Sequence, residues 1–144
     1  MVFRIVISNP KTKKAYQVDK DVPSLIGSKI GQKFDGSMMG LSGFTLEVTG
    51  GSDKEGFPMR GDLDGTARKK VLITKSTGFR GKKMIKRKGK KSKKIEGLRR
   101  RKYVRGNTIS ENIMQINTKV IEGEGDIAMM LGIEKKEETK GEQK

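Results

Sequence analysis

One segment of the chain, residues 68–105, holds more positive charge than the net charge of the whole sequence. It carries 19 lysine and arginine residues and a single acid, Glu96, while all 144 residues together have a formal net charge of +16. Like charges at this density repel one another and need a polyanion to neutralise them. We therefore expect the middle of this segment, residues 78–102, to pack no core of its own and to form a long mobile arm that becomes ordered on a nucleic acid.

The parts on either side of the basic segment 68–105 are close to neutral. Residues 1–67 have a net charge of +1, and residues 106–144 have a net charge of −3. Hydrophobic residues make up 32% of the chain and aromatic residues 5%, which suffices for one small core. We predict four parts: a β-rich part at 1–77, the basic arm at 78–102, closing strands with a short helix at 103–132, and a disordered charged tail at 133–144.

Alternating apolar residues predict β-strands in the first part. Residues 2–8 alternate, and residues 15–18 form the expected returning strand of a hairpin. The segment 27–43 contains five glycines and is expected to be mostly loop. Phe44–Val48 alternates again, and Gly50-Gly51 is expected to end that strand.

Further strands are expected on both sides of the arm. The apolar run Val71-Leu72-Ile73 predicts a central strand of the sheet. Residues 113–121 predict a longer strand, with Met114, Ile116 and Val120 on one face.

The last elements complete the predicted fold class. Residues 104–109 suggest another strand, and Asp126 is placed to cap a short helix at 127–131 that Gly132 closes. The fold class is mainly β: a glycine-rich, antiparallel, barrel-like domain with a long basic arm inserted and a short C-terminal helix.

Two residue types are missing, which removes much common chemistry. The chain has no cysteine and no histidine, so disulfides, thiolate or imidazole metal ligands and cysteine- or histidine-dependent catalysis are excluded. Residues 81–92 lack the spacing of a phosphate-binding loop, and residues 62–65 lack the remaining ligands of a calcium loop. We expect no metal, no cofactor, no small-molecule substrate and no enzyme activity.

Membrane attachment is not expected either. The longest apolar runs span only a few residues, whereas a membrane-spanning helix needs about 20. The start of the chain lacks the pattern of a signal peptide, so the expected location is cytoplasmic.

The arm contains the residue types that contact nucleic acid. Lysine supplies point charges for phosphates, and arginine can bind phosphate bidentately or stack on a base. The candidate RNA-binding residues are Arg60, Arg68, Lys69, Lys70, Arg80, Lys82, Lys83, Lys86, Arg87, Lys88, Lys90, Lys91, Lys93, Lys94, Arg99, Arg100, Arg101, Lys102 and Arg105. Phe79 and Tyr103 are candidates for stacking on unpaired bases, with ordinary packing at the base of the arm as the alternative.

Irregular RNA fits such an arm better than duplex DNA does. A sequence-specific DNA reader usually presents a stable helix to the major groove. No amphipathic helix of that kind is visible, whereas a glycine-broken basic arm can follow an irregular groove. A basic DNA-compacting protein remains the alternative, and an enzyme acting on RNA would need carboxylates and a metal.

Two stretches resemble one protein family. The first is GGSDKEGFPMRGDLDG, residues 50–65, and the second is RRRKYVRGNTISENIMQINTKVI, residues 99–121. They resemble the small-subunit ribosomal protein six-e family of archaea and eukaryotes, and the resemblance extends over about residues 1–125. The chain lacks the long basic C-terminal helix and the clustered serines of the eukaryotic members, so it resembles the short archaeal form.

The resemblance implies a structural constituent of the small ribosomal subunit. It implies binding to the ribosomal RNA of that subunit, contact with neighbouring ribosomal proteins, a role in translation, and a β-rich, barrel-like domain without catalysis.

The first stretch allows two interpretations. Its characteristic residues are Gly50, Gly51, Asp53, Gly56, Phe57, Pro58 and Met59. Glycines permit tight backbone and close approach of a phosphate, and Arg60 could reach one. Alternatively, the run is a shaped turn that stabilises the domain, with Asp53 bonding local amides.

Overall fold

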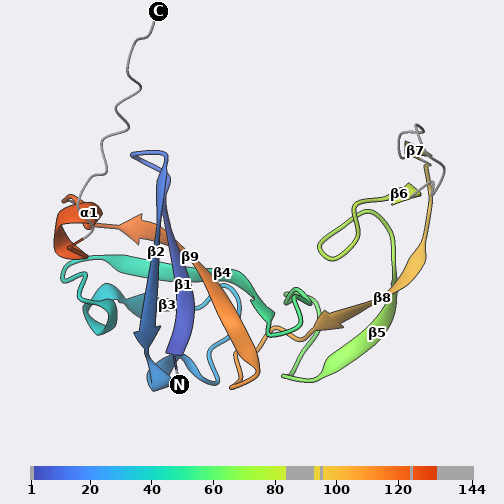
Figure 1. Ribbon diagram of the computed structural model, residues 1–144, viewed down its shortest axis with the longest axis horizontal. Helices are drawn as coiled ribbons and strands as arrows, with labels where there is room; N and C mark the ends of the chain where they lie inside the picture. The colour runs from blue at the N-terminus through green and yellow to red at the C-terminus, as the bar shows by residue number, and fades with distance from the viewer. Residues whose placement is uncertain (1, 84–92, 95, 124, 133–144) are drawn as a thin grey trace, which may run out of the picture.

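Five strands form one mixed sheet that carries the core. The computed structural model describes residues 2–83, 93–94, 96–123 and 125–132. The sheet has the order β2-β1-β9-β4-β3 (Figure 1). Its strands are β1 (Val2–Asn9), β2 (Lys14–Asp21), β3 (Lys33–Asp35), β4 (Thr45–Asp53) and β9 (Ile113–Glu122).

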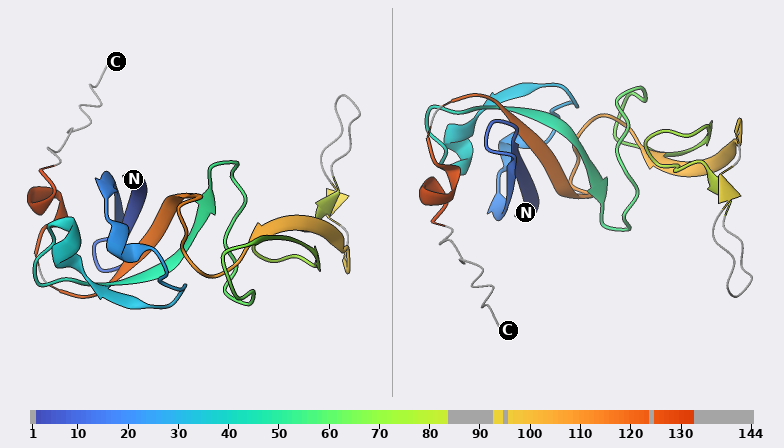
Figure 2. Two further views of the ribbon diagram at one scale, coloured as in Figure 1. Left: turned by 90° about the horizontal axis from the view of Figure 1, so that it is seen from below. Right: turned by 90° about the horizontal axis from the view of Figure 1, so that it is seen from above.

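A pair of two-stranded ladders projects from one end of this sheet. The ladder next to the sheet pairs β5 (Arg68–Ile73) with β8 (Arg100–Arg105), and the outer ladder pairs β6 (Lys82–Lys83) with β7 (Lys93–Lys94). The two views of Figure 2 show both ladders on the side of the sheet opposite the short helix α1 (Ile127–Met130), so the molecule is elongated.

The main core lies on one face of the five-stranded sheet. Phe3, Ile5 and Ile7 are fully buried, as their alternation predicts. Short segments cover this face, among them the 3-10 turns Pro23–Leu25 and Gly36–Met39. One hydrophobic cluster therefore stabilises the sheet end of the molecule.

The predicted fold class is confirmed as mainly β, with two corrections. The sheet is mixed and not purely antiparallel, because β1 pairs in parallel with β9. Among the described residues it does not close into a barrel, since β2 and β3 are its two outer strands. The predicted hairpin of β1 and β2 and the short C-terminal helix are both present.

The prediction of a central strand at Val71–Ile73 is wrong. These residues lie in β5, whose partner is β8 outside the main sheet. A two-stranded ladder exposes much of its surface, and Leu72 is accordingly 54% exposed. At the base of the arm Ile73, Phe79 and Val104 are buried, which agrees with the packing alternative for Phe79.

Two strand details also differ from the sequence prediction. Gly50-Gly51 does not end β4, which continues to Asp53 through register shifts against β9. One shift lies opposite Met114, so Ile113 is buried and Met114 is exposed, although Met114 was expected to share the buried face of Ile116.

The predicted helix is present and spans Ile127–Met130, one residue less than expected. The Asp126 carboxylate accepts a hydrogen bond from the Ala128 amide, as expected of an N-cap. The short strand β3 was not expected, because it lies inside the glycine-rich segment 27–43. The tail at 133–144 lies outside the described residues.

Candidate nucleic-acid interface

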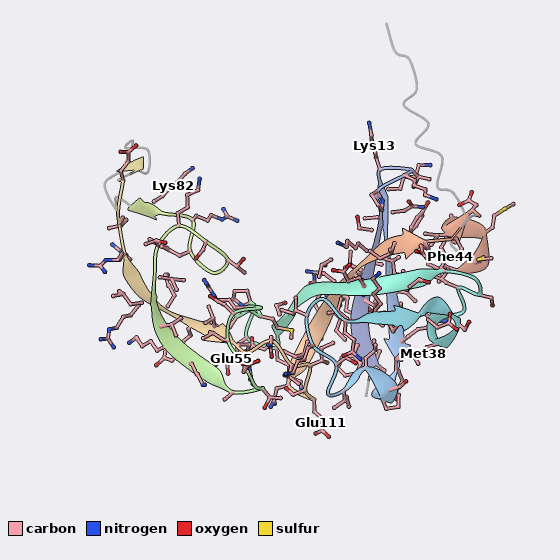
Figure 3. The ribbon with its side chains drawn as sticks, turned by 180° about the vertical axis from the view of Figure 1, so that it is seen from behind. Lys13, Met38, Phe44, Glu55, Lys82 and Glu111 are labelled. Carbon is pink, nitrogen blue, oxygen red and sulfur yellow. The ribbon has the colours of Figure 1, made fainter. Side chains whose placement is uncertain are left out.

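The ladder of β5 and β8 displays many of the basic side chains. Its register pairs Arg68 with Arg105 at the sheet end and Ile73 with Arg100 at the outer end. Figure 3 shows side chains projecting outward along the ladder, with Lys82 beyond it. Several cations are exposed and have no carboxylate partner within the described ranges: Lys69, Arg80, Lys82, Arg99, Arg100, Arg101 and Lys102.

A buried ion pair fixes the ladder to the sheet. Asp53, at the end of β4, has a side chain only 2% exposed, and its Oδ2 accepts a hydrogen bond of 3.0 Å from Nε of Arg105. Its Oδ1 accepts bonds from the amides of Glu55 at 3.0 Å and Phe57 at 2.8 Å. One carboxylate thus shapes the turn after β4 and holds the end of β8.

The hydrogen bonds outweigh the effect of burial on the charge of Asp53. Burial by itself would raise the pKa of this carboxyl. The hydrogen bond and charge of Arg105, with the amides of Phe57 and Glu55, lower the pKa below its ordinary value of 3.8. Asp53 is therefore ionised at neutral pH, as its pairing with Arg105 requires.

Two carboxylates, Asp53 and Glu55, offset the repulsion between two arginines that face each other. Arg68 and Arg105 face each other across the ladder, an arrangement that is destabilising for like charges. Arg105 pairs with Asp53, and Arg68 pairs with Glu55, which Figure 3 shows between the sheet and the ladder. The base of the ladder is thereby neutralised, while its outer part keeps its charge.

Arg60 serves as an internal link in this structure. Its side chain is 15% exposed and binds Asp62 with both Nε (2.8 Å) and Nη2 (2.5 Å), and this hydrogen bond holds the pKa of Asp62 below its usual value. Its Nη1 donates to Ser76 Oγ at 2.8 Å and to the Thr77 carbonyl at 3.0 Å. Arg60 thus ties the segment after β4 to the turn after β5, and its contact with a phosphate stays a prediction.

The loop at residues 61–66 packs onto the segment that follows β8. The Asn107 amide donates to the Leu63 carbonyl at 2.7 Å, and its side chain donates to Asp64 at 2.9 Å. A Cβ on Gly106 would lie 1.9 Å from the carbonyl oxygen of Gly65, so only glycine fits there. Sequence reasoning named neither Gly106 nor Asn107 as a site residue, although both lie in the second family-like stretch.

The two family-like stretches therefore meet in space. We call their contact the anchor: residues 50–66 on one side and residues 104–108 on the other. Gly51 is also closely packed, because a Cβ there would lie 2.4 Å from the Gln115 carbonyl oxygen of β9. These contacts favour the interpretation of residues 50–60 as a shaped turn, while direct contact with RNA remains untested.

The two aromatic candidates have different environments. Phe79 is 8% exposed and is paired through its backbone with Ser76, which fits the packing alternative. Tyr103 is 46% exposed, with its ring against Phe57.

Lys83, Lys93 and Lys94 lie in β6 and β7. The remaining candidates lie outside the described residues: Lys86, Arg87, Lys88, Lys90 and Lys91.

Other classes of site find no support in the described parts of the chain. These parts contain no group of three or more acidic side chains suited to a metal ion. The described helices include none with the length and hydrophobicity of a membrane span. Asp62 and Asp64 instead accept hydrogen bonds from Arg60 and Asn107.

Fold and site together define a class of small β-sheet protein that carries a projecting cationic ladder on a firmly anchored base. Comparison with known proteins gives the particular family, since the model of "Ribosomal protein S6e" matches residues 3–132. The chain belongs to this family. As predicted from the sequence, it is a structural ribosomal protein of the small subunit and not an enzyme.

Archaeal relatives resemble the chain along most of its length. It is 45% identical over 132 residues to small ribosomal subunit protein eS6 of Methanocaldococcus jannaschii, covering 91% of this chain and 92% of the relative. The eS6 protein of Methanosphaera stadtmanae is 48% identical over 132 residues, with 89% and 91% covered. That of Methanothermobacter thermautotrophicus is 43% identical over 134 residues, with 92% and 97% covered.

Proposed function

We propose that the chain binds the ribosomal RNA of the small subunit through the cationic segment 68–105 and so helps to hold that RNA in its folded form. It does so in the cytoplasm, beside neighbouring ribosomal proteins, and supports translation. The observation that carries this proposal is the separation of charge along the ladder. Carboxylates neutralise Arg68 and Arg105 at the anchor, whereas the cations further out have no such partner among the described residues.

The physical basis is the release of counterions from RNA. Each phosphate neutralised by a lysine or arginine frees condensed cations, so affinity falls steeply as salt rises. If about 6–10 phosphates are contacted, affinity should fall by orders of magnitude between about 50 and 200 mM salt. An affinity that barely responds to salt would contradict the proposal.

Sedimentation of a cell lysate through a sucrose gradient tests the proposal directly. We expect the protein to migrate with the small subunit and to remain there after a wash at about 0.5 M salt, because many simultaneous contacts must break together. Migration with free nucleic acid, or full release by the wash, would favour a basic DNA-compacting protein instead.

A further inference from the structure

The ladder of β5 and β8 has two faces of different character. Residues directly opposite each other in an antiparallel ladder share a face. One face buries Ile73 and Val104, and Gly78 lies against both of them. The other face, which we call the Tyr103 face, carries Lys70 and Leu72 from β5 and Arg101 and Tyr103 from β8. Leu72 and Tyr103 are both about half exposed, at 54% and 46%.

The ring of Tyr103 is supported without being covered. Phe57 of the anchor meets it edge to face, with centroids 5.8 Å apart and planes at 62°. Arg68 is paired with Glu55. Its Cζ atom lies 4.9 Å from the centroid of the Phe57 ring and 5.6 Å from the centroid of the Tyr103 ring. The Phe57 amide bonds to Asp53. The position of the ring is therefore set by the anchor.

The groups around the Tyr103 ring favour a ligand that combines a flat ring with neighbouring negative charges. Lys70 Nζ lies 5.4 Å from the ring centroid, and Arg101 comes from the same face of the ladder. An aromatic surface suits a nucleobase, and the two cations suit the phosphates beside it. An exposed cation–π contact is weaker than base stacking, so an arriving base displaces Lys70 from the ring and leaves its charge free for a phosphate.

We propose that Tyr103 stacks on an unpaired base of RNA, with Lys70 and Arg101 holding the adjoining phosphates. The inference rests on the proposed function and makes it more specific, because it assigns one ligand: a nucleotide outside a helix. A base inside a continuous duplex has both faces covered by its neighbours and offers none to the ring.

Tyrosine emission provides a direct test. The chain has two tyrosines and no tryptophan, so Tyr16→Phe leaves Tyr103 as the single reporter in the full-length protein. Tyr16 lies in β2, packed against the sheet core and outside the Tyr103 face. Two labelled RNAs are compared by anisotropy and by emission: a stem-loop with single-nucleotide bulges and a fully paired duplex of equal phosphate number. We expect both RNAs to bind, and only the bulged RNA to quench the emission.

Substitution of the ring separates stacking from charge. Tyr103→Leu should weaken binding of the bulged RNA roughly tenfold and leave duplex binding and the salt dependence unchanged, because no charge is removed. Tyr103→Phe keeps a ring and should recover the lost affinity. Thermal unfolding of each variant controls for structural damage.

The outcomes distinguish the inference from the proposed function. Salt-dependent binding without quenching, or equal quenching by both RNAs, would overturn stacking of Tyr103 on an unpaired base while RNA binding stands. Absence of binding to either RNA would instead overturn the proposed function.

Discussion

At the scale of single residues, Asp53 joins the turn after β4 to the end of β8. Replacing Asp53 with Asn leaves Arg105 charged beside a neutral amide in a site where the two side chains are 2% and 15% exposed. Removing one partner of a buried pair is strongly destabilising, so we expect a loss of about 3 kcal/mol in the free energy of unfolding at pH 7. Denaturant titration measures it, and Asp19→Asn, whose pair with Arg4 is exposed on both sides, serves as the control.

The effect of Asp53→Asn should depend on pH in a defined direction. Because folding lowers the pKa of Asp53, its contribution to stability is complete above the ordinary value of 3.8 and is lost as pH falls through the folded-state pKa. The stability difference between wild type and variant should therefore shrink on acidification below about pH 4. A difference that stays constant down to pH 2 would show that the charge of Asp53 is not what the fold uses.

Gly106 allows a second test of the anchor at the residue scale. Its replacement by Ala places a Cβ 1.9 Å from a backbone oxygen, which cannot yield as a flexible side chain would. We expect Gly106→Ala to lose about 3 kcal/mol or more of unfolding free energy. Gly61→Ala is the matched control: its Cβ meets only Ile30 at 3.9 Å, so unfolding midpoints should barely move.

At the scale of elements, local patterns explain some strands but not others. Phe3, Ile5 and Ile7 alternate because β1 has one buried face, and that pattern is visible in the sequence. Strand β8 has no such pattern: of Arg100–Arg105 only Val104 is buried, and the strand forms because β5 pairs with it. Pairing between two distant segments need not produce an alternation of apolar and polar residues in either segment.

The sequence predicts which residue types make up the candidate site, but it does not predict which residues pair with one another. The excess of cations in 68–105 follows from the sequence, yet nothing local distinguishes Arg105, which pairs with a residue 52 positions away, from its neighbours in the same run. The same holds for Gly106, whose need for glycine arises from contact with Gly65. Arg105 is grouped with the free cations because its partner comes from another element, whereas Asp62, the partner of Arg60, lies only two positions along the chain.

The outer ladder leads to a prediction about order. Its register places Lys82 opposite Lys94 and Lys83 opposite Lys93, so each strand contributes only two residues, and so short a pair of strands is at best marginally stable. We expect the amides of residues 78–102 to exchange rapidly with solvent in the free protein and more slowly when RNA is bound. Hydrogen exchange measures this, with β1 amides as an internal reference; strong protection of 78–102 without RNA would contradict it.

At the scale of the whole molecule, the core and the charge lie at opposite ends. The main hydrophobic cluster belongs almost entirely to the sheet end, and the densest group of exposed cations lies on the ladder that projects away from it, with Lys82 further out (Figure 3). Folding and polyanion binding therefore draw on largely separate sets of residues, connected by the anchor. Changes to the outer cations should alter binding with little effect on stability.

A charge-matched pair of triple variants tests this separation. Replacing Arg100, Arg101 and Lys102 with glutamine removes three cations from β8, and replacing Lys13, Lys14 and Lys33 removes three exposed cations from the sheet end, where Figure 3 shows Lys13. Both variants lose the same net charge and should keep the wild-type unfolding midpoint.

Binding to RNA should nevertheless separate the two variants. Each phosphate contact contributes about 0.7–0.9 to the slope of log affinity against log salt, so the β8 variant should lose about 2 units of slope. The sheet-end variant should lose well under 1 unit, because its cations act only through the long-range field, which salt screens within about 10 Å. Equal losses in both variants would mean that total charge governs binding and that the ladder has no special part in it.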